Sequence, residues 1–119
     1  MTTEYMALRS SAKVSDAIDM LRNFEGGLES VSTIYIIGGG EKLLGQVPLA
    51  KIVLATPETS LMLLSSRHMP TIHPGADEKK VAELFDKYNL LTLPVIDDEG
   101  VLTGVITADD VINMLRAKL

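Results

Sequence analysis

The fold prediction rests on one stretch near the C-terminus, Gly104-Val105-Ile106-Thr107-Ala108-Asp109-Asp110-Val111. It joins the β-rich run of residues 101–107 to a helix that we expect from Asp109 to about Leu115. Another β-rich run, residues 91–96, comes before it, and the turn residues 97–100 separate the two runs. The sequence here therefore predicts a hairpin that leads directly into a helix.

A helix is also predicted before this hairpin. Its apolar side chains follow the i, i+3, i+4 and i+7 spacing of an amphipathic helix: Val81, Leu84, Phe85 and Tyr88. Asp77 is its predicted N-cap, because a carboxylate at that position can accept from a free N–H of the first turn. Further upstream, Leu61-Met62-Leu63-Leu64 predicts a helical turn that opens this half of the chain.

The first half of the chain repeats the same order of elements, so an internal repeat becomes the central prediction. The matching segments are a helix with apolar residues Val14, Ala17, Ile18 and Leu21, a strand at 33–37, a turn at Gly38-Gly39-Gly40, a strand at 42–47 and a short helix at 49–54. Gly45 aligns with Gly104 at an offset of 59 residues, and Ala17 aligns with Val81 at an offset of 64. The first copy therefore holds five more residues than the second, which we place within residues 23–30.

Each copy is predicted to be a β-α-β-β-α unit, with residues 1–58 as the first repeat and residues 59–119 as the second. A unit of this size is too small to bury its own apolar face. The two repeats are therefore expected to pack through their sheets around a shared interior. The predicted fold class is α/β (α+β), in which two repeats pack as one pseudo-symmetric module.

Composition excludes several classes of protein. The chain has 119 residues, 46% of them hydrophobic, a formal net charge of −5 and no Cys, which excludes disulfide scaffolds, thiolate zinc sites and Cys nucleophiles. No apolar run approaches the length of a membrane span, and the N-terminus lacks the features of a signal peptide. The acidic balance argues against a nucleic-acid partner. We expect a small cytoplasmic domain that binds a small molecule, another protein, or both.

The run Leu93-Pro94-Val95-Ile96-Asp97, followed by the stretch 104–111, resembles a tandem pair of cystathionine-β-synthase (CBS) domains, known as a Bateman module. The resemblance covers essentially the whole chain. Within that superfamily the chain is most similar to the cytosolic CBS region of MgtE-type magnesium transporters and related metal-transporter fusions, on residues 1–5, 81–88 and 104–107. In that family the first of these segments lies inside a longer chain, so Met1 is expected to be an excision point.

The resemblance implies a regulatory module with no chemistry of its own, and hence no enzyme. CBS pairs bind adenine nucleotides or related adenosyl ligands, so the implied ligand is ATP, ADP or AMP. They often associate as flat dimers, which implies a homodimer here. In the magnesium transporters the module also senses Mg²⁺ and gates the pore, which implies a membrane transporter chain as the attached or partner protein.

Four residues are the candidates for nucleotide binding: Thr71, Gly104, Thr107 and Asp110. Thr107 ends a strand and Asp110 lies in the first turn of the next helix, where free N–H groups and the helix dipole favour a phosphate. The Thr107 hydroxyl can donate to that phosphate, and the Asp110 carboxylate can accept from ribose hydroxyls. Gly104 would allow a neighbouring segment to approach closely. In the alternative interpretation, Thr107 and Asp110 simply cap the helix.

Thr71 is included because the family has a threonine before the first long helix, near the adenine. The first copy departs from this pattern, since Pro48, Lys51 and Ala7 stand at the equivalents of Thr107, Asp110 and Thr71. Proline offers neither a hydroxyl nor an N–H, and a lysine cannot accept from a ribose. The sequence therefore predicts one nucleotide site per chain, in the second repeat.

An acidic cluster forms a candidate surface for a divalent cation: Asp97, Asp98 and Glu99, near Asp109 and Asp110. Mg²⁺ prefers oxygen ligands and keeps several waters, so exposed carboxylates on a loop suit weak sensing. For each carboxylate taken singly, a solvated turn is the alternative. His68 and His73 lack a recognisable ligand motif and are not expected to bind metal.

Two classes of function stay open at this point. The first is a ligand-sensing module, in which nucleotide binding changes the conformation of an attached transporter or enzyme. The second is a ligand-free dimerisation or scaffold module whose exposed helices assemble a host protein. Catalysis is not expected, because the sequence shows no pairing of a nucleophile with a base.

Overall fold

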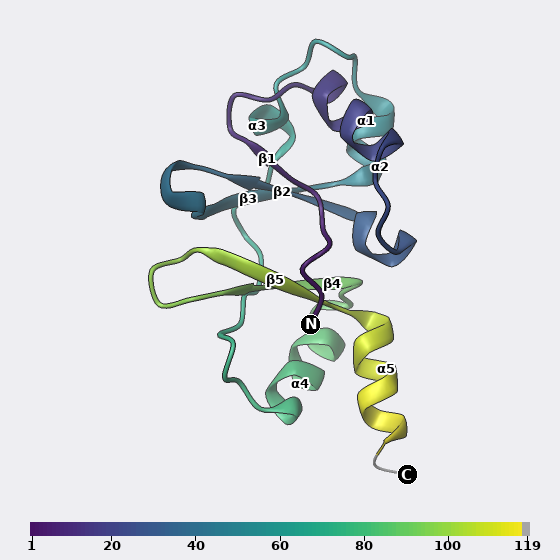
Figure 1. Cartoon of the computed structure of the whole chain (residues 1–119), viewed down its shortest axis with the longest axis vertical. Helices are drawn as coiled ribbons and strands as arrows, with labels where there is room; N and C mark the ends of the chain where they lie inside the picture. The colour runs from purple at the N-terminus through teal and green to yellow at the C-terminus, as the bar shows by residue number, and fades with distance from the viewer. Residues whose placement is uncertain (118–119) are drawn as a thin grey trace.

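The structure is a computed structural model that describes residues 1–117, so the last two residues of the predicted second repeat lie outside the described residues. Two small sheets face each other at the middle of the molecule, and helices cover their outer faces above and below (Figure 1). The molecule measures 48 × 28 × 24 Å along its principal axes. Among the described residues, no helix has the length and apolar character needed to cross a bilayer.

The predicted repeat is confirmed by the order of the elements. The first half contains β1 (Ala7–Arg9), α1 (Val14–Arg22), the 3₁₀ turn η1 (Leu28–Val31), β2 (Thr33–Ile37), the 3₁₀ turn η2 (Gly39–Glu41), β3 (Leu43–Pro48) and α2 (Leu49–Leu54). The second half contains α3 (Leu61–Leu64), α4 (Glu78–Tyr88), β4 (Thr92–Ile96), β5 (Leu102–Thr107) and α5 (Ala108–Arg116). The extra residues of the first copy include η1, between α1 and β2 as predicted.

The two sheets differ in size. The first has three strands in the order β1-β2-β3, with β1 parallel to β2 and β3 antiparallel to it. The second has only the antiparallel pair β4-β5. The strand expected at the start of the second copy is reduced to a single parallel bridge between Ile72 and Val95. Pro70 and Pro74 flank this bridge, and neither can donate an N–H to a longer ladder.

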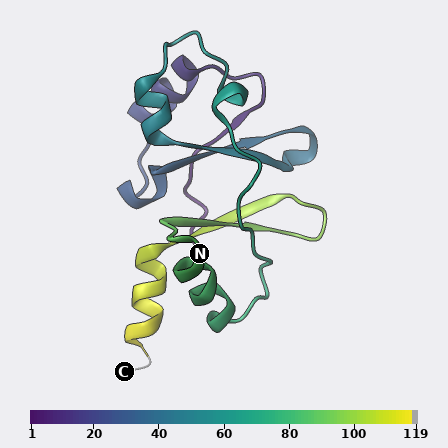
Figure 2. The same cartoon turned by 180° about the vertical axis from the view of Figure 1, so that it is seen from behind.

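Each half also pairs with the segment that leads into the other half. Thr2 exchanges two backbone hydrogen bonds with Val105 of β5, at 2.7 and 2.9 Å. Ser66 does the same with Gln46 of β3, at 2.9 and 3.0 Å. The two pairs are equivalent in the repeat: Ser66 is the counterpart of Thr2 at the offset of 64 residues, and Val105 is the counterpart of Gln46 at the offset of 59. The two hairpin turns lie on the same side of the molecule, where Lys42 bridges Val101 (Figure 2).

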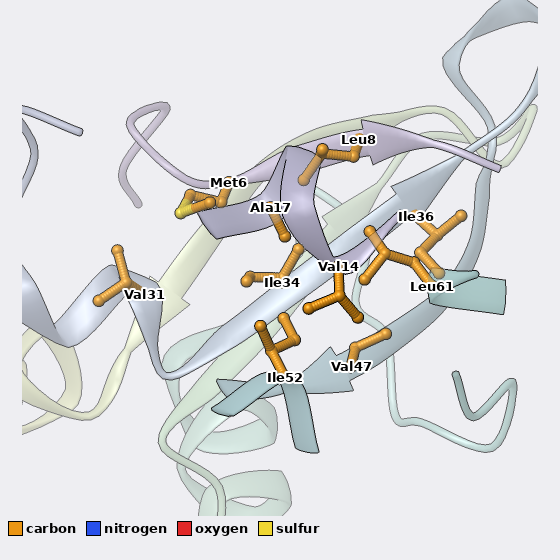
Figure 3. Packing of buried hydrophobic residues seen from close by; sticks show 10 residues of the cluster. All are labelled: Met6, Leu8, Val14, Ala17, Val31, Ile34, Ile36, Val47, Ile52 and Leu61. Carbon is orange, nitrogen blue, oxygen red and sulfur yellow. The ribbon is translucent and has the colours of Figure 1, made fainter. Parts of the chain in front are cut away.

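The apolar interior has three parts. One cluster lies under the first sheet, one lies under the second, and a third lies between the sheets around Tyr35, Leu102 and Val105. Leu61 of α3 is fully buried in the first cluster, beside Val14 (Figure 3). The turn predicted to open the second copy is therefore helical, but it packs in the core of the first half. The repeat boundaries at residues 58 and 59 stay a prediction.

Individual residues explain where α4 begins and ends and where the chain turns between β4 and β5. The Asp77 carboxylate accepts from the backbone N–H of Lys80 at 2.8 Å, which confirms the predicted N-cap of α4. Asn89 ends this helix with φ 54°, a left-handed conformation that asparagine tolerates. Gly100 has φ 84° in the turn between β4 and β5, where a side chain would be strained. These features set the ends of α4 and the turn of the β4-β5 hairpin, whose second strand continues directly into α5.

Candidate functional site

The corner where β5 meets α5 holds two of the predicted nucleotide-binding residues in direct contact. The backbone N–H of Thr107 donates to Oδ2 of Asp110 at 2.9 Å, and the N–H of Asp110 donates to the Thr107 hydroxyl oxygen at 3.2 Å. This reciprocal pair is a capping box. The capping interpretation is thus a structural fact, and any ligand would have to be bound by the groups that capping leaves available.

The capping hydrogen bonds leave one carboxylate oxygen of Asp110 available. The Asp110 carboxylate contacts the Thr107 amide, and the Met1 ammonium at 4.0 Å, through Oδ2 in both cases. The Asp110 side chain is 39% exposed, whereas Thr107 is buried. The α5 N-terminus also has the acidic first turn that complements the helix dipole. The second carboxylate oxygen of Asp110 can therefore accept from a ligand hydroxyl while the cap stays formed.

Gly104 has the role that its position predicts. A Cβ atom there would lie 2.7 Å from the Met1 sulfur and 3.0 Å from the Thr2 carbonyl oxygen. The N-terminal segment thus lies directly against β5, as the Thr2–Val105 pairing requires. Gly104 contributes by allowing this approach, which brings Met1 to the edge of the corner.

Thr71 lies apart from the other three residues. Its neighbour Ile72 bonds to the far edge of β4, through Pro94 and Ile96, while Thr107 lies opposite Thr92 on β5. Strand β4 therefore separates Thr71 from Thr107. The structure brings Gly104, Thr107 and Asp110 together and leaves Thr71, which is half-buried, on the other side of the sheet.

The corner is bounded by a segment from the first half of the molecule. The turn η1 contacts β5 and lies next to the start of α5 in both views (Figures 1 and 2). Leu28, the first residue of η1, is 84% exposed. The extra residues of the first repeat thus lie beside the corner that holds Thr107 and Asp110. The insertion was predicted from the sequence, but its position beside this corner was not.

A cleft of about 480 Å³ adjoins this corner, between α4 and α5. Its lining residues are Met1, Ala76, Glu78, Val81, Ile106, Asp110, Val111, Asn113 and Met114. Two of these residues have acidic side chains, none of the described ones has a basic side chain, and the Met1 ammonium lies 4.0 Å from Asp110. Asp110 therefore belongs both to the capped corner and to the lining of this cleft.

The equivalent corner of the first repeat is built differently. Pro48 precedes α2 and provides no side-chain cap. The Lys51 ammonium, at the equivalent of Asp110, donates to the Leu64 carbonyl oxygen of α3 at 3.5 Å. This corner can therefore attract an anion but cannot accept from a ribose.

The acidic residues proposed for a cation lie in the hairpin turn. Oδ1 of Asp97 accepts from the N–H groups of Glu99 and Val101, at 2.9 and 3.0 Å, so this carboxylate organises the turn. Asp98 is fully exposed and lies 3.5 Å from Nδ1 of His73. Within residues 1–117, no three His, Cys, Asp or Glu side chains group together as metal ligands would. Asp97, Asp98 and Glu99 remain a predicted surface for a weakly bound cation.

One polar contact between the repeats was not predicted. The Tyr35 hydroxyl and the Thr92 hydroxyl lie 2.7 Å apart in a buried hydrogen bond that joins β2 to β4. Burial raises the pKa of Tyr35 to about 12, although the bond to Thr92 acts in the opposite direction. In the sequence, Tyr35 fits the apolar pattern of a strand and Thr92 fits a β-rich run, so nothing signalled their pairing.

Comparison with known proteins connects this geometry to a family. Residues 63–117 match the family model of the CBS domain. The magnesium transporter MgtE of Thermus thermophilus is 31% identical over 118 residues, which cover 99% of this chain and 26% of that protein. The chain thus spans about a quarter of the length of this curated relative.

Solved structures agree over nearly the full chain. The cytosolic domain of the Mg²⁺ channel MgtE in complex with ATP matches with a TM-score of 0.90 and 31% identity, over 96% of this chain and 46% of that one. The CBS pair domain of a candidate Mg²⁺ transporter from Shewanella oneidensis matches with a TM-score of 0.85 and 25% identity, over 98% and 67%. Residues 63–117 therefore match the CBS domain family, and the whole chain has the fold of a CBS domain pair similar to the cytosolic region of MgtE-type magnesium transporters.

Proposed function

We propose that this CBS pair is a regulatory module on the cytoplasmic side of the membrane that binds an adenine nucleotide and controls an attached or partner divalent-metal transporter. One observation carries the proposal: the chain matches, over 96% of its length, a magnesium-channel cytosolic domain that was solved with ATP. CBS domains are regulatory modules, so no catalytic step is proposed for the chain itself. ATP, ADP and AMP are the candidate ligands, with Mg²⁺ as a possible companion.

The Thr107 and Asp110 corner is the proposed binding site. Asp110 offers a carboxylate oxygen to the ribose hydroxyls, and the start of α5 favours a phosphate through its dipole. The turn η1 offers the ligand an apolar surface, the exposed side chain of Leu28. Since the described corner carries two acidic residues, Asp109 and Asp110, an accompanying Mg²⁺ would reduce the repulsion of a polyphosphate. Thr71 would contribute only if the adenine reaches across β4.

Control of a partner requires that the nucleotide favour one arrangement of the two repeats. The corner is formed by β5 and α5 of the second half and by η1 of the first, so a ligand bound there touches both halves. A ligand changes a conformational equilibrium only as far as its affinity differs between the states. In this proposal the affinity of the site for the nucleotide differs between states because a ligand between β5 and η1 would depend on the distance between the two repeats.

Calorimetric titration of the chain with ATP, ADP and AMP, with and without Mg²⁺, tests the proposal. We expect one site per chain, and Asp110→Ala should weaken binding by about 10- to 150-fold, because it removes a charge-assisted hydrogen-bond partner. Asp109→Ala is the matched control, since it removes the same charge from the adjacent, exposed position of the same helix turn and should have a much smaller effect.

Two outcomes would contradict parts of this proposal. A stoichiometry near two nucleotides per chain would refute the single site and would point to the Lys51 corner as well. An absence of heat with every nucleotide, with and without Mg²⁺, would refute sensing and leave the second candidate function, a ligand-free dimerisation module. That alternative is favoured by exposed apolar side chains on the helices: Val53, Leu54, Leu63, Ile112 and Leu115. Light scattering would then be expected to show a homodimer.

A further inference from the structure

The hydroxyl of Tyr35, in the first half, is bonded to a threonine that lies beside the helix cap of the second half. Tyr35 is fully buried, and its hydroxyl oxygen lies 2.7 Å from that of Thr92, the first residue of β4. Thr92 in turn is the register partner of Thr107, whose hydroxyl caps α5. Thr92 therefore connects the first repeat to the proposed nucleotide corner.

Thr92 and Thr107 form the kind of cross-strand pair in which the side chains lie closest. The N–H of Ala108 donates to the Leu91 carbonyl oxygen at 2.9 Å, so the next pair outward is a hydrogen-bonded pair. The two kinds of pair alternate along an antiparallel ladder, which makes Thr92 and Thr107 a non-hydrogen-bonded pair. In such pairs the Cβ atoms are about 4.5–5.5 Å apart, and two threonines can bond to each other. The Thr92 hydroxyl therefore has two groups within reach, the Tyr35 hydroxyl and the Thr107 hydroxyl.

The Thr107 hydroxyl is already used by the helix cap. Its oxygen accepts from the backbone N–H of Asp110 at 3.2 Å, and this bond is half of the capping box. A buried hydroxyl without a partner is costly, so it bonds to the nearest group that can accept or donate. Without the Tyr35 hydroxyl, that of Thr92, which is 5% exposed, would bond to Thr107 and compete with the Asp110 amide. The Asp110 carboxylate, which belongs to the same capping box, would then lose its fixed orientation.

The first repeat lacks the hydroxyl cap and lacks the tyrosine as well. The counterparts of the two threonines are Thr33 and Pro48, which are likewise register partners. Pro48 provides no side-chain cap to α2. The counterpart of Tyr35, at the offset of 59 residues, is Pro94, whose side chain has no polar atom. The buried tyrosine hydroxyl thus faces the half in which a threonine hydroxyl caps the helix.

We propose that Tyr35 is a positioning residue for the nucleotide corner of the other repeat. Its hydroxyl holds the Thr92 hydroxyl away from Thr107 and so keeps the Asp110 carboxylate in its binding orientation. Tyr35 is fully buried, so it acts without touching the ligand. Because the 2.7 Å bond crosses between the repeats, a change in their spacing that breaks it also disturbs the corner. The effect on affinity rests on the proposed nucleotide function, whereas the effect on the cap is measurable without a ligand.

Three variants of the full chain separate this role from a general loss of structure. Tyr35→Phe frees the Thr92 hydroxyl to compete for the cap, so AMP, and ATP with Mg²⁺, should bind about 5- to 10-fold more weakly in calorimetric titration. Tyr35→Phe combined with Thr92→Val also removes the competing hydroxyl, and affinity should return to within about twofold of that of the natural chain. Tyr35→Phe combined with Thr92→Ser is the matched control, because it keeps a competing hydroxyl and should bind as weakly as Tyr35→Phe. A purely structural role predicts no recovery in either double variant.

Amide hydrogen exchange provides a readout of the cap that needs no nucleotide. The Asp110 N–H donates to the Thr107 hydroxyl, and it should exchange about fivefold faster in Tyr35→Phe and return to its natural rate when Thr92→Val is added. The Lys80 amide, which a carboxylate caps at the start of α4, is the internal control and should not change.

The outcomes distinguish this inference from the proposed function. Unchanged exchange at Asp110 in Tyr35→Phe, or no recovery when Thr92→Val is added, would overturn the inference. Unchanged affinity in Tyr35→Phe, in a chain that binds nucleotide, would overturn it as well. If the exchange rates follow the expected pattern but the natural chain binds no nucleotide, the proposed function is refuted and the positioning of the cap by Tyr35 is supported.

Discussion

In the first half of the molecule, Leu61 of α3 is fully buried among residues from α1, β3 and α2, whereas the equivalent space in the second half is an open cleft of about 480 Å³. The first sheet likewise has three strands and the second has two. Since the two longest helices and the hairpin of each half match, the difference comes from the connecting segments: α3 packs on the first half, and the Ile72 segment forms one bridge in place of a strand. The comparison teaches that the first half takes part of its core from the segment that follows it in the chain, so the two halves respond unequally to equivalent substitutions.

The largest expected effect is on the filled core of the first half. Leu61→Ala should lower the free energy of unfolding by about 2–5 kcal/mol, because it removes a fully buried side chain and leaves a cavity. Leu63→Ala, two residues along the same turn and 81% exposed, should change it by less than about 0.5 kcal/mol. Urea unfolding measures both. If the two variants were equally stable, α3 would not be part of the core, and the contrast between the halves would be lost.

The next effect concerns the hydrogen bond between the repeats, which has no symmetric mate. The counterparts of Tyr35 and Thr92 are Pro94 and Thr33, and a proline side chain cannot form such a bond. Tyr35 has a pKa of about 12 in the folded chain against 10.0 as its ordinary value. Below pH 10 its contribution is fully present. As the pH rises toward 12 the unfolded chain loses the proton first, so the free energy of unfolding should fall by about 2–3 kcal/mol.

Denaturant unfolding at pH 9 to 12 checks this dependence. The variant for comparison is Tyr35→Phe combined with Thr92→Val, which removes both hydroxyls and leaves neither buried and unpaired. Its decline with pH should be shallower than that of the natural chain. Tyr5, whose pKa is raised by burial and then by the charge of Glu41, is present in both proteins and cancels in the difference. Equal slopes in the two proteins would show that Tyr35 does not titrate in this range.

The smallest expected effect compares the first turns of the two long helices. Asp77 caps α4 through its carboxylate, whereas its counterpart Lys13, at the start of α1, is bonded through its backbone N–H to Asp16. Asp77→Ala should therefore cost about 1 kcal/mol and Lys13→Ala less than about 0.5 kcal/mol. Thermal unfolding of the two variants measures the difference. Equal losses would mean that the two helix starts are stabilised in the same way.

Much of the secondary structure was predictable because it depends on local patterns. The strand at 33–37 and the helix at 49–54 were predicted with the bounds that the structure shows, and Asp77 was identified as an N-cap. The strand expected around Ile72 was not confirmed as a full strand. The prolines at 70 and 74 limit pairing there, and their effect depends on which neighbour is available to pair.

The candidate site was predictable only in part. Thr107 and Asp110 lie within one helix turn of each other, so their contact follows from sequence spacing alone. Thr71 was grouped with them from the family resemblance, yet β4 lies between them in the structure. The approach of η1 to the corner joins residues about 80 positions apart in the chain, and no local pattern encodes such a distance.

The sequence by itself determined the repeat, its offsets and the chemical difference between the Lys51 and Asp110 corners, because these depend on residue identity and short-range spacing. The tertiary structure decided which half buries Leu61, which segments pair across the repeats and that a cleft beside Asp110 stays open. Apolar burial is not directional, so an apolar turn such as 61–64 can satisfy either of two equivalent surfaces. Only the path of the folded chain determines which of the two it covers.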